Sequence, residues 1–195
     1  LPVPRNVPRL GPRRGRFGAL AAGRHLVADA VAVAAAQDAA KTLGLSGGGL
    51  ARALALCEAG WIGGPVLPAW QRYTGVVHEH LDLAGLPVRV RAAAAARIWV
   101  PSGLAGLVAL DDELPEYRCK AGLRLTLDGR MQTVASWWQP AVTAAVLAAR
   151  PHRVIDLLTT EHRRMVDHSA LLTAGIEVIR IDFVRGDGRG AAGLP

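Results

Sequence analysis

A regular alternation near the end of the sequence constrains the fold most. In residues 176–183 apolar and polar side chains alternate almost perfectly, which is the two-residue period of a half-buried strand. Residues 154–158 form a second β-prone run, and the stretch 161–174 between the two favours a helix. The chain therefore cannot be a bundle of helices alone, and its C-terminal part is predicted to alternate strands with helices.

The rest of the sequence favours helices. Residues 19–43 are rich in alanine and repeat apolar side chains every three to four positions, which predicts an amphipathic helix. Its predicted apolar face consists of Leu26, Ala30, Val33 and Ala34. Further helices are predicted at 49–59, 69–83, 88–96 and 131–149, a short strand at 97–100, and loops at 60–68 and 103–125. These elements indicate a mixed α/β (α+β) fold in which helices cover one small mixed sheet.

The 195 residues are enough for one domain with a sizeable core. We expect that domain to cover residues 19–184. Residues 1–18 are rich in proline and arginine and predict an extended basic arm, which is either a poorly ordered terminus or a phosphate-seeking segment. Residues 185–195 are rich in glycine and predict a flexible tail.

The charge balance points to acidic partners. Lysine and arginine number 23 against 16 acidic residues, a net charge of +7, which favours nucleic acid, anionic lipid or phosphorylated ligands. No 18-residue apolar window lacks a charge or a helix breaker, so we expect no membrane-spanning helix. Cys57 and Cys119 are too few for a disulfide framework, and a reduced, cytoplasmic location is expected.

Few residues suggest catalysis or metal binding. His78 and His80 are two positions apart, so a helix would point them in different directions, and we expect neither a metal site nor a cofactor. Ser102 follows a strand but lacks the glycine two positions earlier that a nucleophile elbow needs. The cationic neighbours of Cys119 would lower the pKa of its thiol if it were exposed, although a quiet structural thiol is the favoured interpretation.

The segment 102–122 is the most informative part of the sequence. Gly103 and Gly106 predict a tight turn whose backbone amides could hold a phosphate, as in the helix-hairpin-helix elements of DNA-binding proteins. Arg118, Lys120 and Arg124 would supply nearby positive charge. Interactions of this kind give salt-dependent affinity without reading the base sequence.

The same segment resembles the central signature of the YaaA peroxide-stress family, and the resemblance extends over about residues 30–184. A second element of the family, Tyr-Thr-Gly-Val, is found at Tyr73, Thr74, Gly75 and Val76. The residues that match the central signature are Ser102, Gly103, Leu104, Gly106, Val108, Asp112, Leu114, Pro115, Tyr117, Arg118 and Gly122. The chain differs from the family at Ala105, where an aromatic residue is usual, and at Ala109 and Leu110, where an Arg-Pro pair is usual.

The resemblance implies a cytoplasmic protein of oxidative stress that helps to lower free iron and binds DNA through a positively charged cleft with a helix-hairpin-helix-like element. We therefore predict non-specific nucleic-acid binding. The alternative is a divergent enzyme of specialised metabolism that uses the cleft for a small anionic substrate, with Tyr73, Tyr117 and Arg118 lining it. The candidate binding residues for either function are Tyr73, Thr74, Gly75, Ser102, Gly103, Gly106, Tyr117, Arg118, Lys120 and Arg124.

Overall fold

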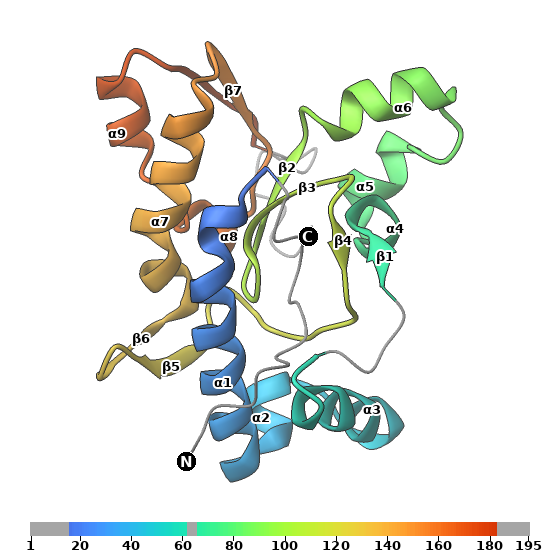
Figure 1. The fold of residues 1–195 in the computed structure, drawn as a ribbon, viewed down its shortest axis with the longest axis vertical. Coiled ribbons are helices and arrows are strands. Elements are labelled where there is room, and N and C mark those ends of the chain that lie inside the picture. Colours follow the sequence, from blue (N-terminus) through green and yellow to red (C-terminus); the bar gives the residue numbers. More distant parts are fainter. Residues whose placement is uncertain (1–15, 62–65, 183–195) are drawn as a thin grey trace, which may run out of the picture.

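The computed structural model describes residues 16–61 and 66–182, and it shows a mixed α/β fold in which about half of these residues are helical (Figure 1). The helical elements are η1 (Gly18–Leu20), α1 (Ala21–Gln37), α2 (Ala39–Leu43), α3 (Gly47–Glu58), α4 (Ala69–Arg72), α5 (Val76–Leu81), α6 (Val88–Ala95), α7 (Val134–Ala149), α8 (Thr160–Arg163) and α9 (His168–Thr173). The strands are β1 (Leu67–Pro68), β2 (Trp99–Ser102), β3 (Gly106–Ala109), β4 (Glu113–Leu114), β5 (Arg124–Leu127), β6 (Arg130–Thr133), β7 (Arg153–Asp156) and β8 (Glu177–Arg180).

The strands form separate pairs, so the prediction of one small mixed sheet is wrong. Three pairs are antiparallel, namely β1 with β4, β2 with β3 and β5 with β6, while β7 pairs in parallel with β8 across the α8–α9 connection. The predicted strands at 97–100, 154–158 and 176–183 are all present within a few residues of these positions. The strands that the sequence did not predict are β1, β3, β4, β5 and β6. Of these, β1 lies in the predicted loop 60–68, and β3, β4 and the start of β5 lie in the predicted loop 103–125.

Three predicted helices are interrupted, and the one expected at 161–174 divides into α8 and α9. The helix expected at 19–43 divides at Asp38, whose side chain accepts a hydrogen bond from the Lys41 backbone N–H and so begins α2. The helix expected at 69–83 divides at 73–75, where Gly75 has a φ of 133°, a value that side chains rarely allow. The break separates α4 from α5, and the ring of Tyr73, which follows α4, stacks on His78 of α5.

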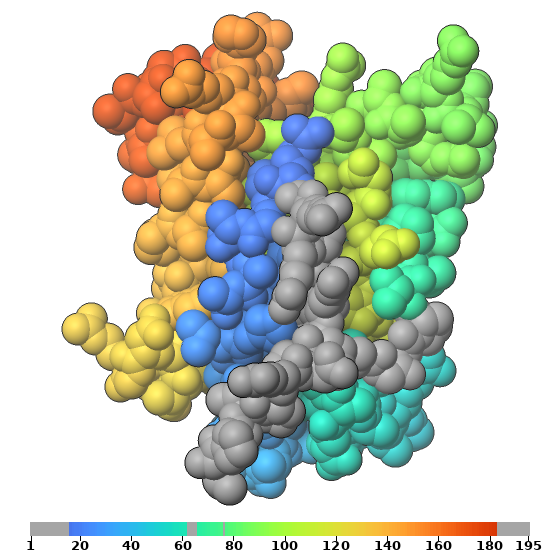
Figure 2. Space-filling model, viewed as in Figure 1, coloured from blue at the N-terminus to red at the C-terminus, as the bar shows by residue number. Residues whose placement is uncertain are grey.

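A β-hairpin replaces the first turn of the helix predicted at 131–149. Asp128 and Gly129 have φ values of 51° and 74°, and they join β5 to β6 through a two-residue loop. Asp-Gly is a preferred sequence for such a turn because both positions need positive φ. Thr133 then begins α7, and its hydroxyl accepts a hydrogen bond from the Ser136 backbone N–H. Figure 2 shows this hairpin projecting from the body of the protein.

The buried face of α1 differs from the predicted one. Leu26 and Val33 are 51% and 64% exposed, and Ala30 and Ala34 are only partly buried. Alanines and valines of α1 lie on all of its faces, so periodicity alone does not show which face is buried. The residues that α1 does bury are Arg24, Val27, Ala28, Val31 and Ala35.

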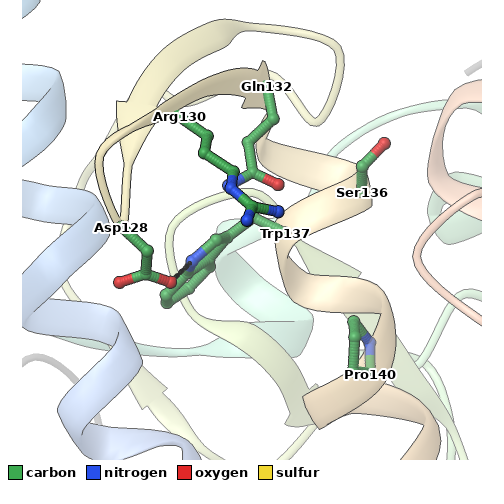
Figure 3. Close-up of a pocket in the computed structure, with 6 residues that line it drawn as sticks. All are labelled: Asp128, Arg130, Gln132, Ser136, Trp137 and Pro140. Atoms are coloured by element: carbon green, nitrogen blue, oxygen red, sulfur yellow. Dashed lines mark hydrogen bonds between the residues drawn. The ribbon is translucent and has the colours of Figure 1, made fainter.

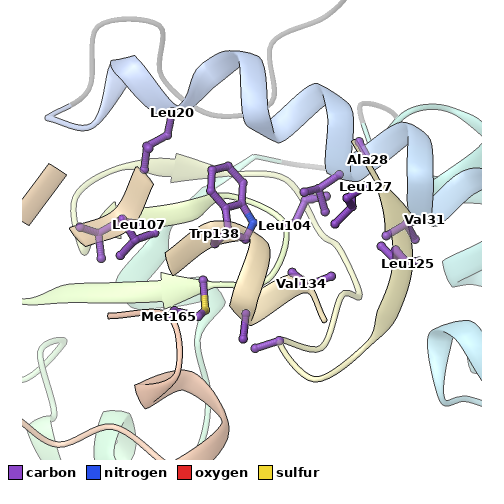
Figure 4. Packing of buried hydrophobic residues seen from close by; sticks show 14 of the residues in the cluster. Leu20, Ala28, Val31, Leu104, Leu107, Leu125, Leu127, Val134, Trp138 and Met165 are labelled. Atoms are coloured by element: carbon purple, nitrogen blue, oxygen red, sulfur yellow. The ribbon is translucent and has the colours of Figure 1, made fainter. Parts of the chain in front are cut away.

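The stretch Gly18–Gln37 is long and apolar enough to cross a membrane, with a mean hydropathy of 1.4, contrary to the expectation from sequence. Core helices of globular proteins have the same length and composition. Here one face of α1 packs against α7, where Trp138 lies over Gly23 (Figure 4).

Two clusters of buried apolar side chains form the core, and the β2–β3 hairpin lies between them. The larger cluster joins α1, α7 and the β5–β6 hairpin, and it includes Leu107 and Ala109 of β3. The smaller cluster joins the α4–α6 region to the other face of β3 through Val108. The alternate residues of β3 therefore face different clusters. Tyr117 packs against both.

The predicted arm at 1–18 and tail at 185–195 lie mostly or wholly outside the described residues. Phe17, the second described residue, already belongs to the core, because it is 3% exposed and its ring meets that of Trp99 edge to face, with centroids 5.3 Å apart.

Candidate functional site

Three hydroxyl groups from distant segments form a continuous chain between the two clusters. The Ser102 Oγ lies 2.6 Å from the Tyr117 Oη, which lies 2.8 Å from the Tyr73 Oη. Ser102 ends β2, Tyr117 lies in the extended segment after β4, and Tyr73 follows α4. The structure thus brings together three of the predicted site residues, all from motifs that carried the family resemblance.

The Ser102 hydroxyl is anchored within its own turn. Its Oγ accepts a hydrogen bond of 3.0 Å from the Ala105 backbone N–H, and the side chain is almost fully buried. Burial raises the pKa of Tyr73 and raises that of Tyr117 well above its usual value. Both phenols are therefore neutral at neutral pH, and they can donate a hydrogen bond or pass a proton but do not supply a phenolate base.

A buried arginine, Arg24 of α1, lies beside this chain. Its guanidinium donates to the Ala105 carbonyl at 3.0 Å and to the Leu107 carbonyl at 3.4 Å, which ties α1 to the β2–β3 turn. Burial lowers the pKa of Arg24, and the negative charge of Asp112 opposes that shift. Sequence reasoning missed Arg24. The signal was its position three, four and seven residues before Val27, Ala28 and Val31, on a face that is otherwise apolar.

Asp112 is the acidic member of the group. Its Oδ2 accepts a 2.9 Å hydrogen bond from the Ala109 backbone N–H, and the residue is 8% exposed. Burial raises the pKa of this carboxyl, while the Ala109 N–H and the charge of Arg24 oppose the rise. Within the described residues Asp112 forms no ion pair with Arg118.

His78 of α5 lies next to Tyr73, at the end of the hydroxyl chain. The two rings are stacked with centroids 5.6 Å apart. Burial lowers the pKa of His78, so the imidazole is neutral at neutral pH. Its Nδ1 is buried and has no hydrogen-bond partner among the described residues.

The two glycines of the predicted phosphate turn are buried. The turn joins β2 to β3, and the described residues show no helix-hairpin-helix element at this position. A side chain at Gly103 would collide with the Cys119 backbone carbonyl, and one at Gly106, which has a φ of 76°, would collide with the Trp138 ring. Close packing therefore explains both glycines. Of the other predicted residues, Thr74 is exposed and Gly75 begins α5.

The three predicted cations lie on the surface, away from the hydroxyl chain. Arg118, Lys120 and Arg124 are all exposed, and within the described residues none forms an ion pair. The Arg124 guanidinium donates a 3.4 Å hydrogen bond to the Met131 carbonyl across the β5–β6 hairpin. The prediction that Arg118 would converge with the tyrosines is not supported by this arrangement.

The structure also places the thiols and the histidines. Burial raises the pKa of the Cys119 thiol to about 12 and also raises that of Cys57. These thiols are protonated at neutral pH, as expected of structural cysteines. Across residues 16–61 and 66–182, no group of three or more His, Cys, Asp or Glu side chains is arranged to hold a metal ion.

Comparison with known proteins identifies the class of this mixed α/β protein. The family model described as "Peroxide stress protein YaaA" matches residues 19–192. The chain belongs to the YaaA peroxide-stress protein family.

Several curated relatives share shorter regions. A UPF0246 protein of Streptomyces coelicolor is 39% identical over 90 residues, which are 46% of this chain and 34% of that protein. A UPF0246 protein of Corynebacterium glutamicum is 30% identical over 122 residues, 62% of this chain and 48% of that protein. One of Corynebacterium efficiens is 30% identical over 125 residues, 64% of this chain and 47% of that protein. The chain thus spans between a third and a half of the length of these relatives.

Proposed function

We propose that the protein binds the phosphate backbone of nucleic acid without sequence preference and serves the peroxide response in the cytoplasm, where it helps to limit free iron. The observation that carries the proposal is a set of three exposed cations close together in the sequence, Arg118, Lys120 and Arg124, which we call the row of cations. The peroxide-stress description of the family supports the physiological setting. The binding surface is this row rather than the buried glycine turn.

Arg118 and Lys120 lie in the extended segment between β4 and β5, and Arg124 is the first residue of β5. The side chains of the extended segment alternate, so that Tyr117, Cys119 and Ala121 face the core while Arg118 and Lys120 face solvent. The Cα atoms of Arg118 and Lys120 are therefore about 7 Å apart, from a rise of about 3.3 Å per residue. Packing on the core fixes the backbone beneath them, which reduces the entropy lost on binding.

Salt dependence of binding tests the proposal. The protein is titrated into a fluorescein-labelled 20-base-pair duplex of scrambled sequence, and anisotropy gives the affinity between 50 and 200 mM salt. The slope of log affinity against log salt becomes shallower by about 0.9 for each phosphate that the protein no longer neutralises. The variant R118Q/K120Q/R124Q is expected to reduce the slope by up to about 2.7 and to bind all sequences more weakly to the same extent.

A control variant distinguishes binding at this surface from a general effect of net positive charge. R89Q/R97Q/R150Q removes the same charge from exposed positions elsewhere in the chain, around α6 and at the end of α7. We expect it to keep most of the affinity and the slope. Equal losses in the two variants, or a wild-type affinity that does not change with salt, would contradict the proposed surface.

The hydroxyl chain favours a second candidate function, an enzyme that binds a small anionic substrate. Neutral Tyr73 and Tyr117 can donate hydrogen bonds to an anion, and Arg24 supplies positive charge nearby. A Tyr73→Phe variant removes one donor but not the ring. If this function holds, ligands found by thermal-shift screening of anionic metabolites lose affinity in Tyr73→Phe but not in the surface variant R118Q/K120Q/R124Q.

A further inference from the structure

An open depression of about 400 Å³ lies between the β5–β6 hairpin and the first turns of α7 (Figure 3). Its volume suits a group of the size of a nucleobase with its sugar. It shares no residue with the hydroxyl chain or with the row of cations. The residues that line it are Asp128, Arg130, Gln132, Ser136, Trp137 and Pro140.

Trp137 provides an aromatic surface whose orientation is fixed. Its indole N–H donates a 2.6 Å hydrogen bond to the Asp128 Oδ2 at the hairpin turn. Its ring also meets the buried Trp138 ring edge to face, with centroids 4.8 Å apart and planes at 72°. Trp138 is itself held by a 2.8 Å hydrogen bond to the Gly103 carbonyl. A half-buried ring restrained from two sides can stack a planar ligand with little loss of entropy.

Polar groups of the hairpin surround that ring. Arg130 and Gln132 are two positions apart in β6, so their side chains lie on the same face of the hairpin. Figure 3 shows the Arg130 side chain extending toward Trp137, and within the described residues this exposed cation forms no ion pair. The Gln132 Nε2 donates to the Leu127 carbonyl at 2.9 Å, which leaves its amide oxygen as an acceptor.

We propose that this depression binds one nucleotide, through its base and its phosphate. Trp137 stacks on the base, Arg130 binds the phosphate, and the free oxygen atoms of Asp128 and Gln132 accept hydrogen bonds from exocyclic amino groups. The proposal deepens the nucleic-acid binding proposed above, by adding an interaction with an unpaired base. It uses none of the three cations of the surface row, so the two proposals can fail separately.

Single-strand binding tests the site. Anisotropy of a fluorescein-labelled ten-residue oligodeoxyadenylate gives the affinity for a single strand, and competition with AMP and with adenosine follows. Trp137→Leu is expected to weaken binding of the strand about 5- to 150-fold, the range measured for one stacked base. Arg130→Gln, on an exposed side chain, is expected to weaken competition by AMP but not by adenosine. Trp70→Leu and Arg97→Gln are the matched controls outside the depression.

The competitors distinguish the source of the ligand. Displacement of the strand by AMP assigns the site to free nucleotides as well as to strands, whereas displacement only by unlabelled oligonucleotide assigns it to single strands. The proposal is overturned if Trp137→Leu binds like Trp70→Leu, or if Arg130→Gln leaves both the strand affinity and the AMP competition unchanged. Loss of duplex binding in R118Q/K120Q/R124Q, with single-strand binding retained, would leave both sites supported.

Discussion

Removal of the central hydroxyl of the Ser102–Tyr117–Tyr73 chain should destabilise the protein more than removal of its end. Tyr117→Phe breaks the 2.6 Å and the 2.8 Å hydrogen bonds together and leaves both neighbours without this partner. Tyr73→Phe breaks only the second hydrogen bond. A buried hydrogen bond contributes about 1 kcal/mol, and a buried group left unpaired costs about 1–3 kcal/mol. We therefore expect losses of about 2–3 kcal/mol for Tyr117→Phe and about 1 kcal/mol for Tyr73→Phe.

The double variant makes the prediction quantitative. Once Tyr117 lacks its hydroxyl, Tyr73→Phe removes no bond between the two residues, so the double variant should cost about 1 kcal/mol less than the sum of the single variants. Urea denaturation followed by tryptophan fluorescence and by circular dichroism gives the three free energies of unfolding. The reasoning fails if the single effects add, or if Tyr73→Phe costs as much as Tyr117→Phe.

Three further perturbations test the packing and the buried charges. Gly106→Ala and Gly129→Ala both place a side chain at positive φ, at a cost of about 1–2 kcal/mol, but only Gly106 also lacks space, so its variant should lose more in urea denaturation. Because burial raises the pKa of Cys119 to about 12, its contribution is complete below the unfolded pKa near 9 and is lost as pH rises toward 12, by up to about 1.4 kcal/mol per pH unit. Denaturation at pH 8 to 11 should show a steeper loss of stability in the wild type than in Cys119→Ala, which keeps only the contributions of Cys57, Tyr73 and Tyr117. Asp156→Asn removes the carboxylate that pairs with the Arg163 guanidinium at 2.6 Å and leaves it only the more exposed Asp182 at 3.3 Å, so it should cost about 1–3 kcal/mol, measured as a lower melting temperature.

Local signals in the sequence predicted the C-terminal elements well. The alternation at 176–183 and the β-prone run at 154–158 correspond to β8 and β7, because a half-buried strand must alternate. The interruption at Gly75 and the Asp128-Gly129 turn also have local causes, positive φ in each case. These two signals were present in the sequence but were outweighed by the helical character of the neighbouring residues.

The arrangement of the candidate site depends on tertiary packing that no local pattern specifies. The resemblance singled out Tyr73, Ser102 and Tyr117, which do meet, but it also suggested Arg118, whose side chain is exposed. The exposure of Arg118 follows from the alternation of side chains along the extended segment after β4, since Tyr117 faces inward and the next residue must face outward. The buried face of α1 could not be predicted because its alanines and valines give little contrast, and with that face the role of Arg24 was missed.

Tyr117 packs against both apolar clusters, and its hydroxyl joins a serine at the end of β2 to a tyrosine beside the smaller cluster. The hydroxyl chain therefore connects the two halves of the core by polar contacts in addition to their apolar packing, with about 1 kcal/mol contributed by each hydrogen bond. A ligand or a chemical change that separated the two phenols would remove the hydrogen bond by which Tyr117 reaches Tyr73, beside the smaller cluster, and leave the contact between the clusters to apolar packing.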